Sequence, residues 1–196
     1  MENKNFYENY MQIFLEENSK VNLISKNAEN FLWEKHVYDS LAISNFFDKY
    51  GIPKTLLDIG TGGGFPAVPI AMTYSDIRVT ALDSIGKKIN AVNSIKEKLH
   101  LSNLNPVCLR VENLDEKFDV VTSRAVSSLK NICEYALPKL YKGGYFVAYK
   151  SRKTPDEIDE AKNVLKKYNA KIIDIIDYEL PVDEDLSRNL IVIKRM

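Results

Sequence analysis

A chain of 196 residues is long enough to build one complete hydrophobic core and too short for two large domains. Hydrophobic residues make up 45% of it, charged residues 28%, and the formal net charge at pH 7 is zero, so the overall charge does not point to a polyanionic partner. No apolar stretch approaches a membrane span and no signal-peptide pattern follows Met1. We expect one cytoplasmic, monomeric domain, with a helical extension over residues 1–50 packed on a core of residues 51–196.

The segment 1–50 carries apolar residues at helical spacing, which predicts helices with packing faces. These residues are Phe6, Tyr10, Ile13, Phe14, Phe31, Leu32, Trp33, Val37, Leu41 and Phe46. On such a helix His36 and Ser40 share a face, and Asp39 lies one position round from Ser40. The three polar residues either form a local network or line a binding cleft, and their spacing leaves both open. With no cysteine or second histidine nearby, no metal site is expected.

The stretch from Thr55 to Pro69 organises the rest of the chain. Apolar residues at 56, 57 and 59 predict a buried strand, the glycines at 60 and 62–64 predict a turn, and Pro66 opens an apolar helical segment. Glycines allow a ligand to approach the backbone closely, and the first turn of a helix attracts negative charge. A strand, glycine turn and helix in this order therefore predict a phosphate or carboxylate site.

The glycine spacing distinguishes between two kinds of nucleotide-binding motif. A dinucleotide fingerprint G-x-G-x-x-G beginning at Gly60 requires glycine at position 65, where the chain has Phe65. The run from Asp58 to Gly64 is instead D-x-G-x-G-x-G, which resembles motif I of class I S-adenosylmethionine (SAM) methyltransferases. The alternative is that the glycines only form a tight corner between a strand and a helix.

The region after the glycine turn continues the α/β pattern. Residues 78–83 predict a strand ending in Asp83, Ser84 is a candidate helix N-cap, and residues 87–99 carry one apolar face. Further strands are expected at 106–111 and 118–123. Because parallel strands bring their carboxyl ends to one edge of a sheet, we expect Asp58, Asp83, Glu112 and Arg124 to converge there.

The remaining chain completes a doubly wound sheet. Helices are expected at 128–140 and 155–167, a strand at 145–149, and an antiparallel hairpin from strands 171–178 and 189–194. Cys108 and Cys133 have no metal-binding spacing and are expected to be buried, reduced thiols. Basic residues gather at Lys20, Lys26 and Lys35, at Lys87 and Lys88, and at Lys150, Arg152 and Lys153. Such local patches are the candidate RNA contacts of a neutral chain.

Several strings together resemble the RsmG (GidB) family of bacterial small-subunit rRNA methyltransferases over nearly the whole chain. They are Asn22-Leu23, H-x-x-D-S-L from His36 to Leu41, L-D-I-G-T-G-G-G-F-P from Leu57 to Pro66, Leu82-Asp83-Ser84 with Gly86-Lys87-Lys88, Arg110-Val111-Glu112 and Ser123-Arg124-Ala125. The glycine motif alone is typical of a superfamily, whereas its pairing with H-x-x-D-S-L and S-R-A is much narrower. The family's G-[IV]-P is replaced here by Ala67-Val68-Pro69.

The resemblance implies an α/β class I SAM-dependent methyltransferase (Rossmann-like) fold, with a seven-stranded, mostly parallel sheet and an antiparallel last strand. It also implies SAM as methyl donor and N7 of a guanine in the 530 loop of 16S rRNA, as rRNA or small ribosomal subunit, as acceptor. Implied cofactor-binding residues are Asp58, Gly60, Gly62, Gly64, Phe65, Asp83, Ser84, Val111, Glu112 and Arg124, with Phe65 as an apolar lid. Candidate substrate-binding residues are His36, Asp39, Ser40, Lys150 and Arg152; Arg124 and His36 are the catalytic candidates.

Two other functions stay open. The glycine loop equally permits a class I methyltransferase acting on another RNA, a protein or a small molecule, and it permits a module that binds SAM or a nucleotide without turnover. Guanine N7 carries a lone pair and no proton, so methylation there requires no general base. Arginine stays protonated, which makes Arg124 a positioning group rather than an acid.

Overall fold

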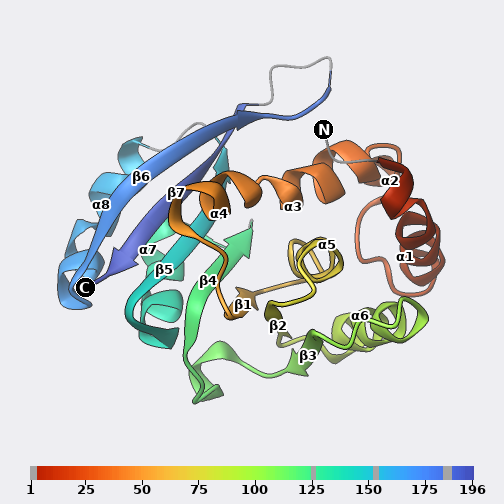
Figure 1. Cartoon of the computed structure of the whole chain (residues 1–196), viewed down its shortest axis with the longest axis horizontal. Coiled ribbons are helices and arrows are strands. Elements are labelled where there is room, and N and C mark those ends of the chain that lie inside the picture. Colours follow the sequence, from red (N-terminus) through yellow and green to blue (C-terminus); the bar gives the residue numbers. More distant parts are fainter. Residues whose placement is uncertain (1–3, 125–126, 152–154, 183–186) are drawn as a thin grey trace.

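The computed structural model of the chain describes residues 4–124, 127–151, 155–182 and 187–196 (Figure 1). The strands are β1 (Thr55–Ile59), β2 (Arg78–Asp83), β3 (Leu104–Cys108), β4 (Phe118–Arg124), β5 (Leu140–Ser151), β6 (Ala170–Glu179) and β7 (Ser187–Arg195). The α-helices are α1 (Glu8–Val21), α2 (Lys26–Glu29), α3 (Asp39–Leu41), α4 (Ser44–Tyr50), α5 (Ala67–Thr73), α6 (Gly86–Lys98), α7 (Leu129–Ala136) and α8 (Pro155–Lys167). Short 3₁₀ segments are η1 (Lys4–Tyr7), η3 (Val111–Asn113) and η4 (Leu137–Lys139), and η2 (Trp33–Tyr38) is a π-helix.

The described strands form one sheet in the order β3-β2-β1-β4-β5-β7-β6. The pairs among β1 to β5 are parallel, whereas β7 runs antiparallel to both β5 and β6. The expected seven-stranded sheet with its antiparallel last strand and terminal hairpin is confirmed. The chain runs from β1 outward to β3 and returns on the other side of β1 as β4. In open α/β sheets, ligands bind beyond the carboxyl ends of the strands at such a reversal of strand order.

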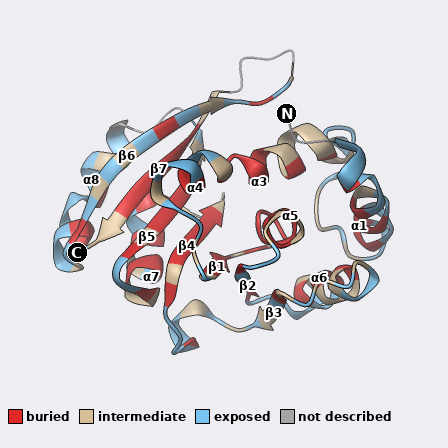
Figure 2. Ribbon diagram, in the orientation of Figure 1, coloured by how far each residue is buried: buried red, intermediate tan, exposed pale blue. Residues whose placement is uncertain are grey.

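Helices cover both faces of the sheet (Figure 1), and the central strands are largely buried (Figure 2). Successive strand residues point to opposite faces. Leu56 of β1 packs into the cluster that includes Phe14 of α1 and Val68 of α5, while its neighbour Leu57 packs with Leu129 of α7 on the other face. Both leucines are fully buried, so β1 is the central strand of two hydrophobic layers.

The described part of the N-terminal extension, residues 4–50, belongs to this core. Tyr10 and Phe14 of α1 and Phe46 of α4 lie in the same hydrophobic cluster as Leu56 of the sheet. Packing was wrongly expected for Phe6 and Phe31, whose side chains are 57% and 42% exposed. Within the described residues, no helix combines the length and apolar character required to cross a membrane.

Three local expectations were wrong near the edge of the sheet. The strand expected at 106–111 is β3, Leu104–Cys108, and Val111 already belongs to the 3₁₀ segment η3. Ser84 does not cap α6: the N-cap residue is Ile85, whose N–H donates to Oδ1 of Asp83 at 2.9 Å. Cys108 is exposed because it ends the peripheral strand β3, whereas Cys133 is buried as expected.

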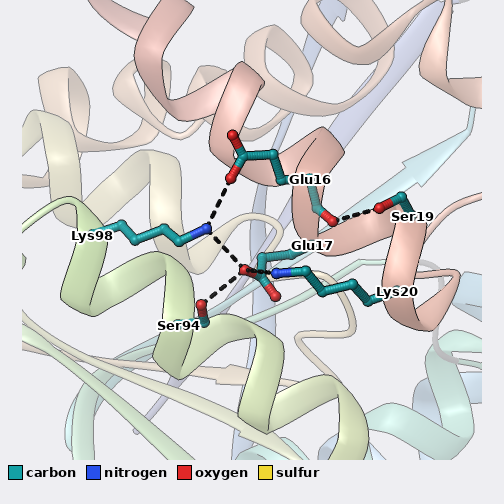
Figure 3. A network of polar contacts seen from close by, with 6 residues as sticks. All are labelled: Glu16, Glu17, Ser19, Lys20, Ser94 and Lys98. Carbon is teal, nitrogen blue, oxygen red and sulfur yellow. Dashed lines mark hydrogen bonds and ion pairs between the residues drawn. The ribbon is translucent and has the colours of Figure 1, made fainter.

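Glu17 of α1 carries a buried carboxylate that ties this helix to α6 (Figure 3). Its Oε1 accepts hydrogen bonds from Lys20 at 2.8 Å, Ser94 at 2.8 Å and Lys98 at 3.1 Å. Burial by itself raises the pKa of Glu17, but these donors outweigh it and lower the pKa to about 2. The charged carboxylate therefore stabilises the docking of the N-terminal extension on the core.

Replacement of Glu17 by glutamine is expected to lower the free energy of unfolding at pH 7 by ~1–3 kcal/mol, the scale of a lost charge-assisted hydrogen bond. Because the folded pKa of about 2 lies below the ordinary 4.5, this stabilisation is present above pH 4.5 and is lost as the pH falls toward 2. Urea unfolding at several pH values measures it. Glu16→Gln, at a side chain that is 63% exposed, is the control and should change little. A difference between wild type and Glu17→Gln that is constant with pH contradicts the assignment.

Candidate functional site

The loop between β1 and α5 holds three glycines in the left-handed region of backbone conformation. Gly60, Gly62 and Gly64 have φ angles of 72°, 57° and 92°, which side chains other than glycine rarely adopt. The N–H groups of Gly60 and Thr61 donate to the carbonyl of Leu82 at 2.8 and 2.9 Å. The loop is thereby fixed against the carboxyl end of β2.

The last glycine of the loop is required by packing as well as by conformation. A Cβ at Gly64 would lie 2.6 Å from Cγ2 of Val68, whereas a Cβ at Gly62 meets only a backbone oxygen at 3.9 Å. Both alanine exchanges carry a left-handed penalty of ~1–2 kcal/mol. Because of the added clash, Gly64→Ala should destabilise the fold by ~1–3 kcal/mol more than Gly62→Ala does. Urea unfolding of the two variants measures this, and equal losses contradict it.

Asp83, at the end of β2, joins the glycine loop to the start of α6. Its Oδ2 accepts from the N–H of Gly62 at 3.0 Å and its Oδ1 from the N–H of Ile85 at 2.9 Å. Beside it lies the first cavity, of about 390 Å³. The lining residues are Ile59, Gly60, Leu82, Asp83, Ser84, Ile85, Lys88, Leu109, Arg110, Val111, Glu112, Arg124, Ile132 and Tyr135.

The first cavity contains six of the predicted cofactor-binding residues and suits a nucleoside. These six are Gly60, Asp83, Ser84, Val111, Glu112 and Arg124. The carboxylates of Asp83 and Glu112 can accept hydrogen bonds from ribose hydroxyls or an exocyclic amine, and Ile85 and Val111 supply apolar walls for a base. The predicted convergence of Asp83, Glu112 and Arg124 on one edge of the sheet is therefore observed.

Asp58 does not reach this cavity. It is fully buried, and its Oδ1 accepts from the hydroxyl of Thr122 at 3.1 Å. Burial raises the pKa of Asp58 to about 6, against the lowering effect of the neighbouring Thr61 and Thr122 hydroxyls and of Arg124. Its position within the sheet supports a role beneath the glycine loop and gives no support to direct cofactor contact.

Phe65 is also placed differently from the expectation. Its ring is 4% exposed and packs against Tyr10 and Phe14 of α1, with ring centroids 6.1 and 4.9 Å away. His36 lies over the same ring at 5.1 Å. Held by aromatic neighbours from the N-terminal extension, Phe65 is an anchor between that extension and the loop rather than an apolar lid.

Arg124, at the end of β4, links the sheet to the N-terminal extension. Its Nη1 donates to Oδ2 of Asp39 at 2.8 Å and to the carbonyls of Lys35 and His36 at 3.2 and 3.4 Å. Its Nη2 lies 3.1 Å from Nδ1 of His36, and its guanidinium lies 5.2 Å from the Phe65 ring centre. Asp39 is 5% exposed, so this is a largely buried ion pair.

The contact with Arg124 determines which ring nitrogen of His36 carries the proton. A guanidinium has no acceptor, so Nδ1 of His36 must accept and the ring proton is on Nε2. Burial, together with the positive charges of Arg124 and Lys35, lowers the pKa of His36 to about 4. The ring is therefore neutral at pH 7.

Titration of His36 should appear in stability rather than in activity. The folded pKa of about 4 lies below the ordinary 6.5, so His36 favours folding fully above pH 6.5 and progressively less as the pH falls toward 4. Between pH 7.5 and 5, wild type should lose stability faster than His36→Gln, with a limiting slope of ~1.4 kcal/mol per pH unit. Guanidinium unfolding at both pH values measures this, with the exposed His100→Gln as control. Parallel slopes for wild type and His36→Gln contradict the neutral state.

A second cavity, of about 580 Å³, lies on the other side of Arg124. Its lining residues are Lys35, His36, Asp39, Arg124, Ser127, Tyr149, Lys150, Ser151, Glu157, Tyr178 and Arg188. Three predicted substrate-binding residues, His36, Asp39 and Lys150, are among them. Lys150 pairs with Glu157 at 2.7 Å, which offsets its charge. Arg152 and its neighbour Lys153 lie outside the described residues.

Ser40, also predicted to bind substrate, does not line the second cavity. It is fully buried, and its hydroxyl donates to the carbonyl of His36 at 2.5 Å. Its own carbonyl accepts from the hydroxyl of Tyr149 at 2.7 Å. The structure therefore gives Ser40 a role in holding α3 against β5 and no direct contact with substrate.

Among the residues of the second cavity that sequence reasoning missed are Tyr149, Glu157 and Tyr178. Tyr178 Oη donates to Oδ1 of Asp39 at 2.7 Å, and Glu157 Oε2 accepts from the N–H of Leu129 at 2.8 Å as well as from Lys150. No local pattern marks the two tyrosines, because their partners Ser40 and Asp39 lie 109 and 139 positions away in the sequence. A usable signal for Glu157 was its place in the first turn of α8, where carboxylates are favoured.

Solved structures confirm the class of fold. A SAM-dependent O-methyltransferase from Thermotoga maritima is similar with a TM-score of 0.62 and 20% identity, over 88% of this chain and 72% of that one. TYW2 from M. jannaschii, solved in complex with AdoMet, is similar with a TM-score of 0.63 and 16% identity, over 82% of this chain and 76% of that one. The fold is that of class I SAM-dependent methyltransferases.

Sequence comparison identifies the family. The model of the GidB family, rRNA small subunit methyltransferase G, matches residues 3–180. "Ribosomal RNA small subunit methyltransferase G" of Lachnoclostridium phytofermentans is 39% identical over 97% of this chain and 80% of its own length. Its namesake in Staphylococcus saprophyticus is 37% identical over 96% of this chain and 81% of its own length. The chain belongs to the GidB family of methyltransferases, whose methyl donor is SAM.

Proposed function

We propose that this protein transfers the methyl group of SAM to N7 of a guanine in the 530 loop of 16S rRNA. The main observation behind the proposal is that the two cavities lie next to each other and have a lining residue in common. Arg124 lines both, so groups bound in the two cavities are neighbours. The family match and the rRNA methyltransferase names of the relatives support rRNA as the acceptor.

The first cavity holds the cofactor, which supplies an electrophilic methyl group when bound. Asp83 and Ser84 bind the ribose, and Val111 and Glu112 bind the adenine, since carboxylates accept from hydroxyl and amino groups and Val111 provides an apolar surface. The glycine loop lets the ligand approach the backbone closely near Gly60. The residues present therefore fit SAM.

The second cavity holds the acceptor base. Guanine N7 needs no deprotonation, and the two catalytic candidates suit a reaction without a general base: Arg124 stays protonated, and His36, with a pKa of about 4, is a weak base. Their work is to orient the base and exclude water. Such positioning contributes roughly 7–11 kcal/mol to a transfer reaction.

The acceptor base reaches this cavity only if it leaves its stack, because stacked neighbours block access to the ring. Lys35 and Lys150 at the second cavity provide positive charge beside the Arg124 guanidinium, although Lys150 is paired with Glu157. We propose that the protein acts as a cytoplasmic monomer on naked 16S rRNA, the small subunit or an assembly intermediate.

Transfer of labelled methyl from SAM to these three RNA forms tests the proposal. We expect label in 16S rRNA and none in ribosomal proteins. Label in protein or in a small-molecule extract, with none in rRNA, overturns the proposal in favour of another class I methyltransferase. SAM binding without transfer to any acceptor overturns it in favour of a binding module. Asp83→Ala serves as the transfer-deficient control, because it removes the loop support and a ribose ligand together.

A further inference from the structure

A tyrosine of the C-terminal hairpin supports the residue that separates the two cavities. Tyr178 lies on β6, and its hydroxyl donates to Oδ1 of Asp39 at 2.7 Å. The other carboxylate oxygen, Oδ2, accepts from Nη1 of Arg124 at 2.8 Å. The Asp39 carboxylate is thus held from two sides, by an aromatic hydroxyl and by a guanidinium.

The orientation of Arg124 depends on where this carboxylate points. Asp39 is 5% exposed, so water offers it little compensation, and its two oxygens are committed to two different elements, β4 and β6. A carboxylate that loses one of two donors can rotate toward the other, and a guanidinium held by charge-assisted bonds follows it. Burial, followed by the charge of Asp39 and its hydrogen bond, raises the pKa of Tyr178, so its hydroxyl remains a donor at pH 7.

We propose that Tyr178 is a positioning residue for methyl transfer, acting through Asp39 on Arg124. Its chain of contacts continues from Arg124 Nη2 to Nδ1 of His36, 3.1 Å away, so the same network also orients the imidazole beside the acceptor. The effect on transfer rests on the proposed function, whereas the effect on the orientation of Arg124 does not.

The molecule provides a matched control. Tyr50 of α4 donates to Oδ2 of Asp174 on β6 at 3.1 Å. Like the Tyr178–Asp39 bond, this bond joins β6 to the N-terminal extension, but Asp174 pairs with Lys49 and has no contact with Arg124. Tyr178→Phe and Tyr50→Phe therefore each remove one tyrosine–aspartate bond between the same two parts of the fold.

Single-turnover methylation and the His36 ring signals in ¹⁵N–¹H spectra are measured for both variants. For Tyr178→Phe we expect a fall in the transfer rate of about tenfold, an unchanged dissociation constant for SAM, and displaced His36 ring signals. For Tyr50→Phe both readouts should match wild type. Unchanged His36 signals in Tyr178→Phe, or an equal loss of rate in Tyr50→Phe, overturn the proposal. Displaced signals with no transfer even by wild type support the positioning role and contradict the proposed function instead.

A double-mutant cycle separates positioning from general stability. If Tyr178 acts through Arg124, then Tyr178→Phe should cost nothing further in transfer rate in an Arg124→Lys background. A full tenfold loss in that background shows independent action and overturns the proposal. The four proteins of the cycle, which are wild type, the two single variants and the double variant, are compared well below their unfolding midpoints. Unfolded protein then does not affect the measured rates.

Discussion

Replacement of Arg124 by leucine is expected to abolish methyl transfer and to lower the free energy of unfolding by ~3–5 kcal/mol. The loss is large because the carboxylate of Asp39, 5% exposed, remains buried after its charged partner is gone, with the Tyr178 hydroxyl as its side-chain donor among the described residues. Leucine also removes the guanidinium from the Phe65 ring, 5.2 Å away. Urea unfolding followed by circular dichroism measures the stability, and labelled SAM measures the transfer.

Two further variants identify the cause of that loss. Arg124→Leu combined with Asp39→Leu removes the buried charge altogether, so stability should recover in large part while transfer stays absent. Lys49→Leu removes a partner from the more exposed Lys49–Asp174 pair, whose side chains are 55% and 24% exposed, and should cost less than ~1 kcal/mol. A loss for Arg124→Leu as small as that for Lys49→Leu contradicts the buried ion pair.

Replacement of Asp83 by alanine is expected to weaken SAM binding by ~3 kcal/mol, roughly a hundredfold. Two backbone donors, the N–H groups of Gly62 and Ile85, lose their acceptor, and the ribose loses a ligand in the first cavity. Isothermal calorimetry measures the affinity. Asp83→Asn keeps one carbonyl oxygen and should show a smaller loss. Unchanged affinity in Asp83→Ala removes the loop and this cavity from the cofactor site.

Several elements of the fold were predictable from local pattern. The strand at 78–83 and the helix at 155–167 have the expected bounds, because each combines a clear apolar period with a boundary residue such as Pro155. The long strand β5 was recognised only from 145 to 149. Its first residues include Gly143 and Gly144, which are typical of a turn, and only pairing of Leu140 with Phe118 of β4 draws them into the sheet.

The positions of the site residues could likewise be predicted only in part. Asp83, Glu112 and Arg124 were expected together because strand ends of a parallel sheet meet at one edge, and they line one cavity. Asp58 was expected there for the same reason but is buried against Thr122 of β4, because the two residues are paired across the strands and their side chains point to the same face of the sheet. The Asp39–Arg124 and Asp39–Tyr178 contacts join residues 85 and 139 positions apart, a distance over which spacing carries no information.

Analysis of the methylated nucleoside tests the central proposal most directly. After reaction of small subunits with labelled SAM, digestion of the 16S rRNA and mass spectrometry identify the base and atom that carry the methyl group, and chain cleavage at 7-methylguanosine gives its position. We expect a single labelled product, 7-methylguanosine, located in the 530 loop and absent with Arg124→Leu. Label on another atom, on another base or outside that loop contradicts the proposed function.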